Sequence, residues 1–232
     1  MGETRSIRTS DGGTMNAYVA RPSRSPAPAV VVIQEIFGVN KVMRDITDGL
    51  AGQGYLAICP DLFWRIEPGV DITDQSEAEW KKAFELYNAF DVDKGVEDIA
   101  ATIADIRGDS TCNGKVGAVG FCLGGLLAYL TATRTDADAS VAYYGVGIEN
   151  RLDEAPKIAR PLMLHIAEED QFVPKPAQAQ IVGALKSHPQ ITIHSYPDRD
   201  HAFARMGGEH YHEADARTAG ERSLAFFKQH LG

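Results

Sequence analysis

Residues 115–125 read KVGAVGFCLGG, and this stretch decides which fold the chain adopts. Its first five residues predict a strand, and residues 124–133 predict the helix that follows. Cys122 lies between them with a glycine two positions to either side, the spacing of a nucleophile elbow with Cys in place of Ser. A tight, strained turn leaves no room for side chains there, which favours glycine. The alternative is a buried cysteine that only packs in a glycine-rich turn.

Strands and helices are expected to alternate on both sides of this stretch. Continuous apolar runs predict buried strands at residues 29–33 and 55–59, and further strands are predicted at 115–119, 140–144, 161–166 and 191–196. Apolar periodicity predicts helices at residues 41–53, 124–133, 176–187 and 213–230, and two more within 77–107 that break near Phe90 and Asp91. Residues 6–9 and 15–20 predict a hairpin closed by a turn at 11–13.

This order predicts an α/β fold in a single domain over residues 1–232. Alternation implies parallel pairing and right-handed crossovers, so we expect a mostly parallel central sheet of about eight strands with helices on both faces. The opening hairpin adds an antiparallel edge. Ligands of such sheets bind beyond the carboxyl ends of the strands, so reactive side chains at those ends carry the most weight.

Composition narrows the classes of function. The hydrophobic fraction of 44% is that of a globular domain, and the formal net charge of −9 disfavours nucleic acid and anionic membranes as partners. The three cysteines, an odd number, do not form a disulfide framework, and the first residues show no signal peptide. We therefore expect a cytoplasmic protein, a monomer or small homo-oligomer, that acts on a small molecule.

A base and an acid for Cys122 are expected at later strand ends, in the chain order nucleophile, acid, histidine. Asp170 follows the strand predicted at 161–166 and is the best candidate acid, with Glu168 and Glu169 as less favoured ones. His201 follows the next strand. Taken singly, Asp170 reads as a helix cap or a turn residue and His201 as a surface loop residue. Their coincidence at successive strand ends, in the right order, favours catalysis.

The remaining histidines do not compete with His201. His165 lies inside an apolar strand and is predicted to be a core residue, and His188, His194 and His230 are predicted at loop, strand and terminal surface positions. His210 and His212 belong to no recognised zinc motif, so neither a metal nor another cofactor is predicted.

Residues 34–38 read QEIFG and follow the first buried strand. In this architecture that loop supplies one oxyanion-hole N–H, here that of Ile36, and the residue after the nucleophile, Leu123, supplies the other. Glu35 is then an acid beside the nucleophile. Its spacing alone predicts only a partly solvated carboxylate at a strand end.

Together with residues 143–145 (YYG) and 201–203 (HAF), these motifs give the chain a nearly end-to-end resemblance to the dienelactone hydrolase (carboxymethylenebutenolidase) family of α/β hydrolases. The resemblance implies Cys122 as nucleophile, His201 as base and Asp170 as its orienting acid. It also implies Glu35 as a partner of the resting thiol that keeps it protonated, and Arg205 as a ligand of the substrate carboxylate.

One position departs from the family pattern. A second carboxylate-binding arginine is expected at residue 80, where this chain has Trp80, followed by Lys81. A lysine replaces the charge of an arginine but not its planar fork. Phe37, Trp80, Lys81 and Tyr143 are predicted to join Arg205 around the substrate.

The resulting prediction is a carboxylic ester hydrolase of aromatic-compound breakdown. It would open a small carboxylated enol-lactone, such as dienelactone to maleylacetate, through a Cys-His-Asp triad and a thioester. The first alternative is a broad-specificity esterase or lactonase of the same family, which Trp80 favours. The second is a non-catalytic redox-sensing protein with Cys122 as its thiol, against which the complete set of catalytic residues argues.

Overall fold

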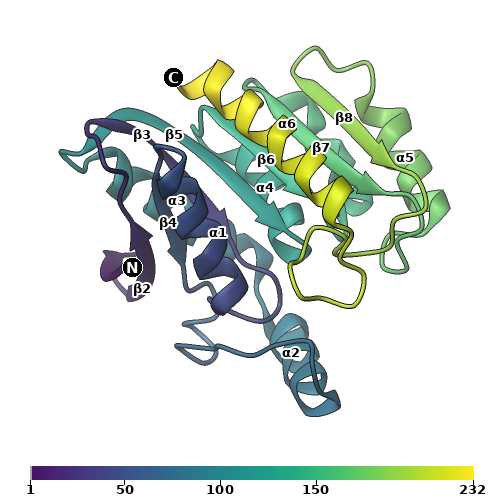
Figure 1. Ribbon diagram of the computed structural model, residues 1–232, viewed down its shortest axis with the longest axis horizontal. Coiled ribbons are helices and arrows are strands. Elements are labelled where there is room, and N and C mark those ends of the chain that lie inside the picture. The colour runs from purple at the N-terminus through teal and green to yellow at the C-terminus, as the bar shows by residue number, and fades with distance from the viewer. Residues whose placement is uncertain (1) are drawn as a thin grey trace. The chain divides into compact units, whose positions relative to one another are not determined.

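The computed structural model describes residues 2–232, and its contacts group into two compact units, Met1–Ala118 and Val119–Gly232. Eight strands pair in the order β1-β2-β4-β3-β5-β6-β7-β8 (Figure 1). The predicted α/β fold, with its mostly parallel sheet of eight strands and antiparallel edge, is confirmed. Over residues 2–232, none of the helices combines the length and the hydropathy that a bilayer span requires.

The first unit carries the antiparallel edge. Its elements are β1 (Glu3–Arg8), β2 (Thr14–Ala20), β3 (Ala27–Ile33), α1 (Lys41–Gly52), β4 (Leu56–Pro60), α2 (Glu77–Ala89), α3 (Val92–Arg107) and most of β5 (Cys112–Phe121). β1 pairs antiparallel with β2 and β2 with β4, whereas β3 and β4 are parallel. Val30 to Ile33 are fully buried, as the continuous apolar run predicts.

The second unit continues the alternation. After the end of β5 come α4 (Leu123–Arg134), β6 (Ala139–Tyr143), a 3₁₀ segment (Ile148–Lys157), β7 (Leu162–Ala167), α5 (Lys175–Leu185), β8 (Ile191–Tyr196) and α6 (Glu213–Leu231). β6 pairs parallel with β7, and β7 with β8. Residues 123–133 of α4 are all buried, so this helix is covered on every side.

Element boundaries follow from local chemistry. The predicted break near residues 90 and 91 is confirmed, because Asp91 Oδ1 accepts hydrogen bonds of 3.0 Å from the amides of Asp93 and Lys94 and caps α3. β5 begins at Cys112, earlier than predicted. The prediction missed its first four residues because they are not buried and carry no apolar signal. The 3₁₀ segment was not predicted, since a polar run containing Pro156 shows no regular periodicity.

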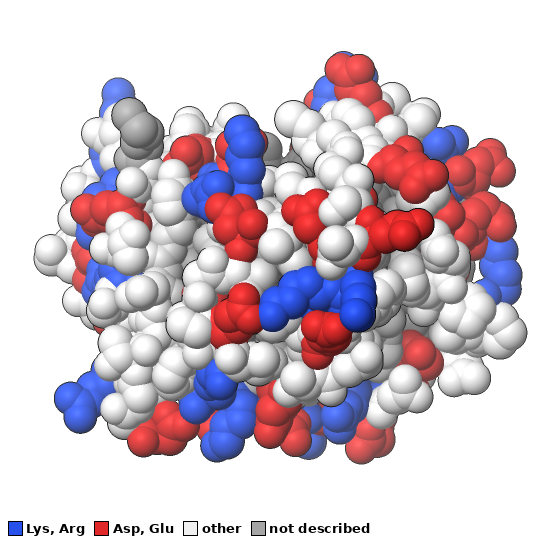
Figure 2. All heavy atoms as spheres, turned by 90° about the horizontal axis from the view of Figure 1, so that it is seen from below, with Lys and Arg blue, Asp and Glu red and all other residues white. Residues whose placement is uncertain are grey.

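Surface charge is mixed in sign. On the face that Figure 2 shows, basic and acidic side chains of the described residues intermingle and do not gather by sign. That face therefore offers no basic stripe of the kind that follows a nucleic-acid backbone.

Candidate active site

Cys122 occupies a strained turn between β5 and α4. Its φ of 58° and ψ of −116° lie outside the regions that L-residues favour. A Cβ on Gly120 would lie 1.8 Å from the Gly124 carbonyl oxygen, and one on Gly125 would lie 2.4 Å from the Tyr143 carbonyl oxygen. Both positions therefore require glycine. Gly120 is one of the two elbow glycines and has the steric reason that the motif predicts, whereas Gly125 lies one residue beyond the motif and is required by the approach of β6.

Backbone hydrogen bonds hold the elbow in place. The Cys122 amide donates to the Tyr143 carbonyl over 3.1 Å, and the Cys122 carbonyl accepts from the Gly125 amide over 2.9 Å. Leu123 begins α4, so its N–H belongs to the first turn, where amides have no partner inside the helix. This helix end is positive and favours an anionic sulfur or oxyanion next to it.

The loops after β7 and β8 bring Asp170 and His201 together. Oδ2 of Asp170 lies 2.9 Å from Nδ1 of His201, and both residues are 4% exposed. The other carboxylate oxygen, Oδ1, accepts from the amides of Phe172 at 2.8 Å and Val173 at 3.1 Å. Asp170 does not cap a helix, because α5 begins later in the chain and has no side-chain cap. Its bonds to the amides two and three residues later are those of a turn residue, the other alternative for this position.

The two other candidate acids are placed differently. Glu169 is exposed, and its carboxylate pairs with the Lys175 ammonium at 2.8 Å. Glu168 lies at the end of β7, where its amide donates to the Tyr196 carbonyl over 3.1 Å. Of the three acids, Asp170 is the one that the structure bonds to His201.

Residues that were not singled out from the sequence orient the imidazole. Asp200 Oδ1 accepts from the amides of His201, at 2.6 Å, and Gln171, at 3.1 Å, and so joins the two loops. The rings of Phe172 and Tyr144 meet the imidazole edge-on, with centroids at 4.8 and 5.1 Å. The sequence signal that could have found Asp200, Phe172 and Tyr144 was their position next to, or close to, the candidate residues in the chain.

The electrostatics of His201 favour its protonated form. Burial alone would lower its pKa, but the nearby Cys122 sulfur and the hydrogen bond to the Asp170 carboxylate outweigh burial and raise the pKa to about 10. Nε2 makes no hydrogen bond of regular geometry, which is common for catalytic contacts in a site without substrate. An imidazolium facing the sulfur is the arrangement that stabilises a thiolate.

Backbone strain gathers around these residues. Among residues 2–232, the non-glycine residues with positive φ are Cys122, Tyr144, Asp198 and Ala202. They lie just after β5, just after β6, just after β8 and next to His201. Strained backbone costs about 1–3 kcal/mol per residue and concentrates at functional sites. Its position here supports a site at the carboxyl ends of β5, β6 and β8.

In the first unit, the loop after β3 is buried and rigidly held. Gln34 Oε1 accepts from the Leu62 amide over 3.0 Å. Position 38 requires glycine for two reasons: its φ is 77°, and a Cβ there would lie 2.0 Å from the Val70 carbonyl oxygen. Glu35 is 1% exposed, so the prediction of a partly solvated carboxylate is wrong. Ile36 and Phe37 are also buried.

Trp80 and Lys81 are placed very differently. The Trp80 ring meets Phe37 edge-on at 5.1 Å and stacks on Phe84 at 5.6 Å. Its indole N–H donates to the Asp74 carbonyl over 3.0 Å. The Lys81 side chain is 81% exposed, with its ammonium 4.0 Å from Glu85. This exposure gives no support to the predicted substrate contact of Lys81.

Arg205 and Tyr143 are both buried in the second unit. Arg205 is 7% exposed, which contradicts the surface placement that is usual for an arginine. Tyr143 is 4% exposed, and its hydroxyl lies 2.7 Å from Ser223 Oγ on α6. Since that hydroxyl is engaged inside the protein, the predicted substrate role of Tyr143 gains no support from its placement.

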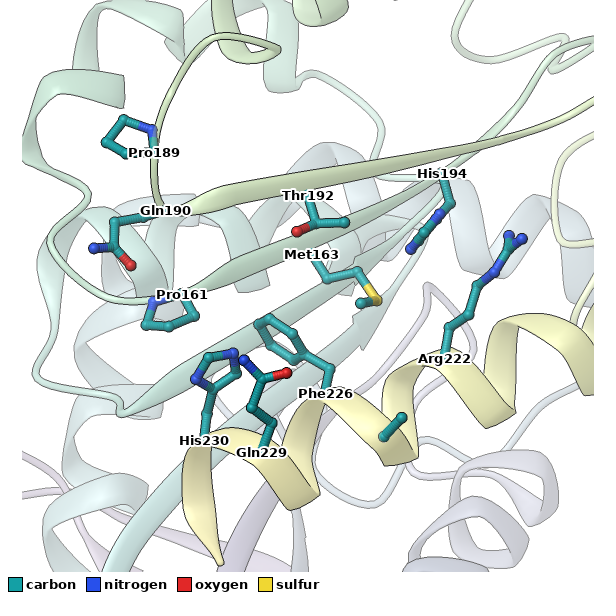
Figure 3. A pocket seen from close by; sticks show the side chains of 11 residues that line it. Pro161, Met163, Pro189, Gln190, Thr192, His194, Arg222, Phe226, Gln229 and His230 are labelled. Atoms are coloured by element: carbon teal, nitrogen blue, oxygen red, sulfur yellow. The ribbon is translucent and has the colours of Figure 1, made fainter.

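The other histidines lie elsewhere. His165 is 1% exposed and belongs to the core, as predicted. His212 accepts from the Asp215 amide at the start of α6. His194 lines a pocket of about 440 Å³ between β7, β8 and α6, into which Arg222 also projects (Figure 3). None of the predicted catalytic residues lines this pocket.

Known proteins resemble the chain over nearly its whole length. The model of the dienelactone hydrolase family matches residues 15–231. A relative from Azospirillum brasilense, provisionally named a carboxymethylenebutenolidase, is 50% identical and covers 98% of each chain. A carboxymethylenebutenolidase of Pseudomonas putida is 42% identical over 95% of this chain and 94% of its own. The crystal structure of a provisionally named dienelactone hydrolase from Klebsiella pneumoniae superposes with a TM-score of 0.86 at 29% identity, over 99% of this chain and 98% of that one.

Proposed function

The chain belongs to the dienelactone hydrolase family and is a carboxylic ester hydrolase, and we propose that it opens a small carboxylated enol-lactone through a thioester on Cys122. The reaction would convert a dienelactone and water to maleylacetate. The observation that carries the proposal is the buried Asp170–His201 pair, whose imidazole interacts with a cysteine on a strained elbow. The anionic substrate, a cytoplasmic location and a monomeric or small homo-oligomeric state belong to the same proposal.

Acylation begins with the thiolate of Cys122. It attacks the lactone carbonyl carbon, and the N–H groups of Leu123 and Ile36 bind the oxyanion. The ring C–O bond then breaks, leaving the acyl group on sulfur and an enolate as leaving group. His201, protonated at the start, gives its proton to that enolate and becomes neutral. An enolate is a good leaving group, so this step needs little acid assistance.

Deacylation restores the starting state. Neutral His201 takes a proton from water, and the hydroxide formed attacks the thioester carbonyl. The C–S bond breaks, which releases the carboxylic acid product and regenerates the thiolate beside an imidazolium. Asp170 holds Nδ1 of His201 throughout, so that Nε2 points at the reacting atoms, and its charge stabilises the imidazolium.

Two buried charges would adjust this chemistry. Following the family resemblance, the Glu35 carboxylate keeps the resting thiol protonated until substrate arrives. The thiol proton then passes to His201, which gives the thiolate and imidazolium from which acylation starts. The Arg205 guanidinium grips the substrate carboxylate with two parallel hydrogen bonds. Trp80 supplies an apolar wall with Phe37 in place of a second cation. The preference for carboxylated substrates is therefore weaker than in a family member with both arginines.

An assay over paired lactones, identical except for a carboxylate, tests the proposal. The wild-type protein hydrolyses the carboxylated members faster, mass spectrometry of a quenched reaction detects the acyl group on Cys122, and Cys122→Ala is inactive. Arg205→Ala loses about tenfold to a hundredfold in kcat/KM on the carboxylated lactones and spares the neutral ones. Near-native turnover by Cys122→Ala would overturn the proposal.

A broad-specificity esterase is the second candidate, and Trp80 at the position of a carboxylate-binding arginine favours it. Equal loss by Arg205→Ala on charged and neutral substrates would support this candidate. The redox-sensing alternative predicts reversible oxidation of Cys122 by peroxide without hydrolysis of an aryl ester. The pairing of His201 with Asp170 argues against it, because sensing needs a reactive thiol but no oriented base.

A further inference from the structure

We propose that a buried network of neutral side chains centred on Ser223 positions the nucleophile elbow through Tyr143, a role that rests on the proposed function of Cys122. Tyr143 contacts the elbow twice. Its carbonyl accepts the Cys122 amide hydrogen over 3.1 Å, and its ring packs on that of Phe121, with centroids 4.7 Å apart. Any displacement of Tyr143 therefore moves the sulfur.

Tyr143 is itself held by two other elements. Its hydroxyl lies 2.7 Å from Ser223 Oγ on α6, and its ring lies 4.2 Å from that of His165 on β7. The three residues are 4%, 7% and 1% exposed, so water does not compete for these contacts. None of them takes part in the proposed reaction, which leaves their polar groups without another explanation.

The network continues to the pocket of Figure 3. His165 places Nδ1 2.8 Å from the Tyr196 hydroxyl and Nε2 3.0 Å from Ser223 Oγ. The Tyr196 hydroxyl accepts from Nη1 of Arg222 over 3.1 Å, and Arg222 lines that pocket. Ser223 Oγ also lies 2.9 Å from the Ala219 carbonyl, which only accepts.

One arrangement of hydrogens satisfies all of these contacts with a neutral imidazole. The single Ser223 proton goes to the Ala219 carbonyl, so Ser223 Oγ must accept from both Tyr143 and His165. His165 then carries its proton on Nε2, and Nδ1 accepts from the Tyr196 hydroxyl. Every donor and acceptor has a partner, and each bond has one direction. A network of this kind specifies one geometry and rigidifies the core around it.

The electrostatics agree with this arrangement. Burial, with the nearby charges of His194 and Arg222, lowers the pKa of His165 well below its usual value. Burial also raises the pKa of the Tyr143 hydroxyl. Both groups therefore stay neutral at physiological pH, as the hydrogen count requires.

Ser223→Ala and Tyr143→Phe test the role of the network. Each removes one hydroxyl and keeps the remaining shape of the side chain. Because a small displacement of a nucleophile costs up to about a hundredfold in rate, we expect kcat to fall about tenfold while KM changes less than about twofold. In both variants, alkylation of Cys122 by iodoacetamide in the absence of substrate should be slower than in the wild-type protein, or its pH profile should be shifted. ¹⁵N NMR should show His165 with its proton on Nε2.

Thr102→Val is the matched control. Thr102 is a fully buried helical hydroxyl that donates to the carbonyl four residues earlier, as Ser223 does, but it lies in α3 and bonds to no network residue. The control should leave kcat and the alkylation profile unchanged at a comparable loss of Tm. Unchanged kcat and alkylation in Ser223→Ala and Tyr143→Phe, or equal losses in Thr102→Val, would overturn the proposal. If Ser223→Ala does not fold, Tyr143→Phe decides alone.

Failure of the proposed function looks different. In that case the wild-type protein would hydrolyse no lactone or ester, or Cys122→Ala would remain active. The alkylation profiles and the NMR assignment do not depend on substrate, so they report on the network in either case.

Discussion

Nδ1 of His201 lies 2.9 Å from Oδ2 of Asp170, although 31 positions separate the two residues in the chain. The carboxylate is fully occupied, because its other oxygen accepts two backbone amides. Two aromatic rings, those of Tyr144 and Phe172, pack against the imidazole. A pair held this tightly keeps one ring nitrogen on the acid and leaves the other for chemistry.

His201 and Asp170 are expected to act as a unit. Asp170→Asn and His201→Gln should each lower kcat by orders of magnitude, and the double variant should be little worse than the poorer single one, because residues that act together are non-additive. Steady-state kinetics of the three proteins on one lactone measures this. The control is Glu169→Gln, whose exposed carboxylate does not contact His201 and should matter little. Losses that multiply in the double variant would mean that the two residues work independently.

Gly120→Ala should abolish activity and destabilise the protein. Its Cβ would lie 1.8 Å from the Gly124 carbonyl oxygen, so the elbow must shift, and overpacking of this kind costs about 1–3 kcal/mol. Gly183→Ala in α5 is the control, because nothing lies within 4 Å of its added Cβ. We expect it to stabilise the protein by about 0.5–1 kcal/mol. Urea unfolding and activity of both variants check the prediction, which native activity in Gly120→Ala would contradict.

Glu35→Gln should raise the reactivity of the Cys122 thiol in the absence of substrate. Under the proposed role, removing a buried negative charge favours ionisation of the sulfur. Alkylation at neutral pH is best measured in a Cys112→Ala background, because Cys112 is partly exposed. Cys59 should not interfere, since it is fully buried and burial raises its pKa. An unchanged alkylation rate would leave Glu35 a structural acid.

Glu154 should make folding stability sensitive to acid. Hydrogen bonds from Arg134 Nε at 2.9 Å and Nη2 at 2.5 Å outweigh burial and lower the pKa of this carboxyl to about 2, from 4.5. A depressed folded-state pKa contributes stability that is fully present above about 4.5 and is lost as pH falls toward about 2.

Urea unfolding of Glu154→Gln and wild type across this range measures the effect. The difference in unfolding free energy should be constant near neutral pH and should shrink between pH values of about 4.5 and 2. The exposed pair of Glu169 with Lys175 supplies the comparison, since such pairs contribute only about 0–1 kcal/mol. A gap between Glu154→Gln and wild type that stays constant down to pH 2 would contradict the assignment.

Much of the fold could be predicted from local sequence. Apolar runs and periodicity predicted the strands and the long helices, because burial on one or both faces leaves its signature in consecutive residues. The glycine spacing around Cys122 predicted the elbow, because the contact that requires Gly120 lies within the same turn. Local patterns missed two segments that have no apolar pattern. The exposed start of β5 and the 3₁₀ segment carry no apolar signal.

The sequence by itself determined the order of the candidate catalytic residues along the chain: a cysteine on an elbow, then an acid, then a histidine. It ranked Asp170 above Glu168 and Glu169, but all three follow the same strand, and the path of the loop decides which carboxylate meets His201. It also left Arg205 and Glu35 as plausible surface or half-solvated residues, yet both are buried. The Ser223 network was invisible for the same reason. Its members come from β6, β7, β8 and α6, and their hydrogen bonds exist only once those elements pack together.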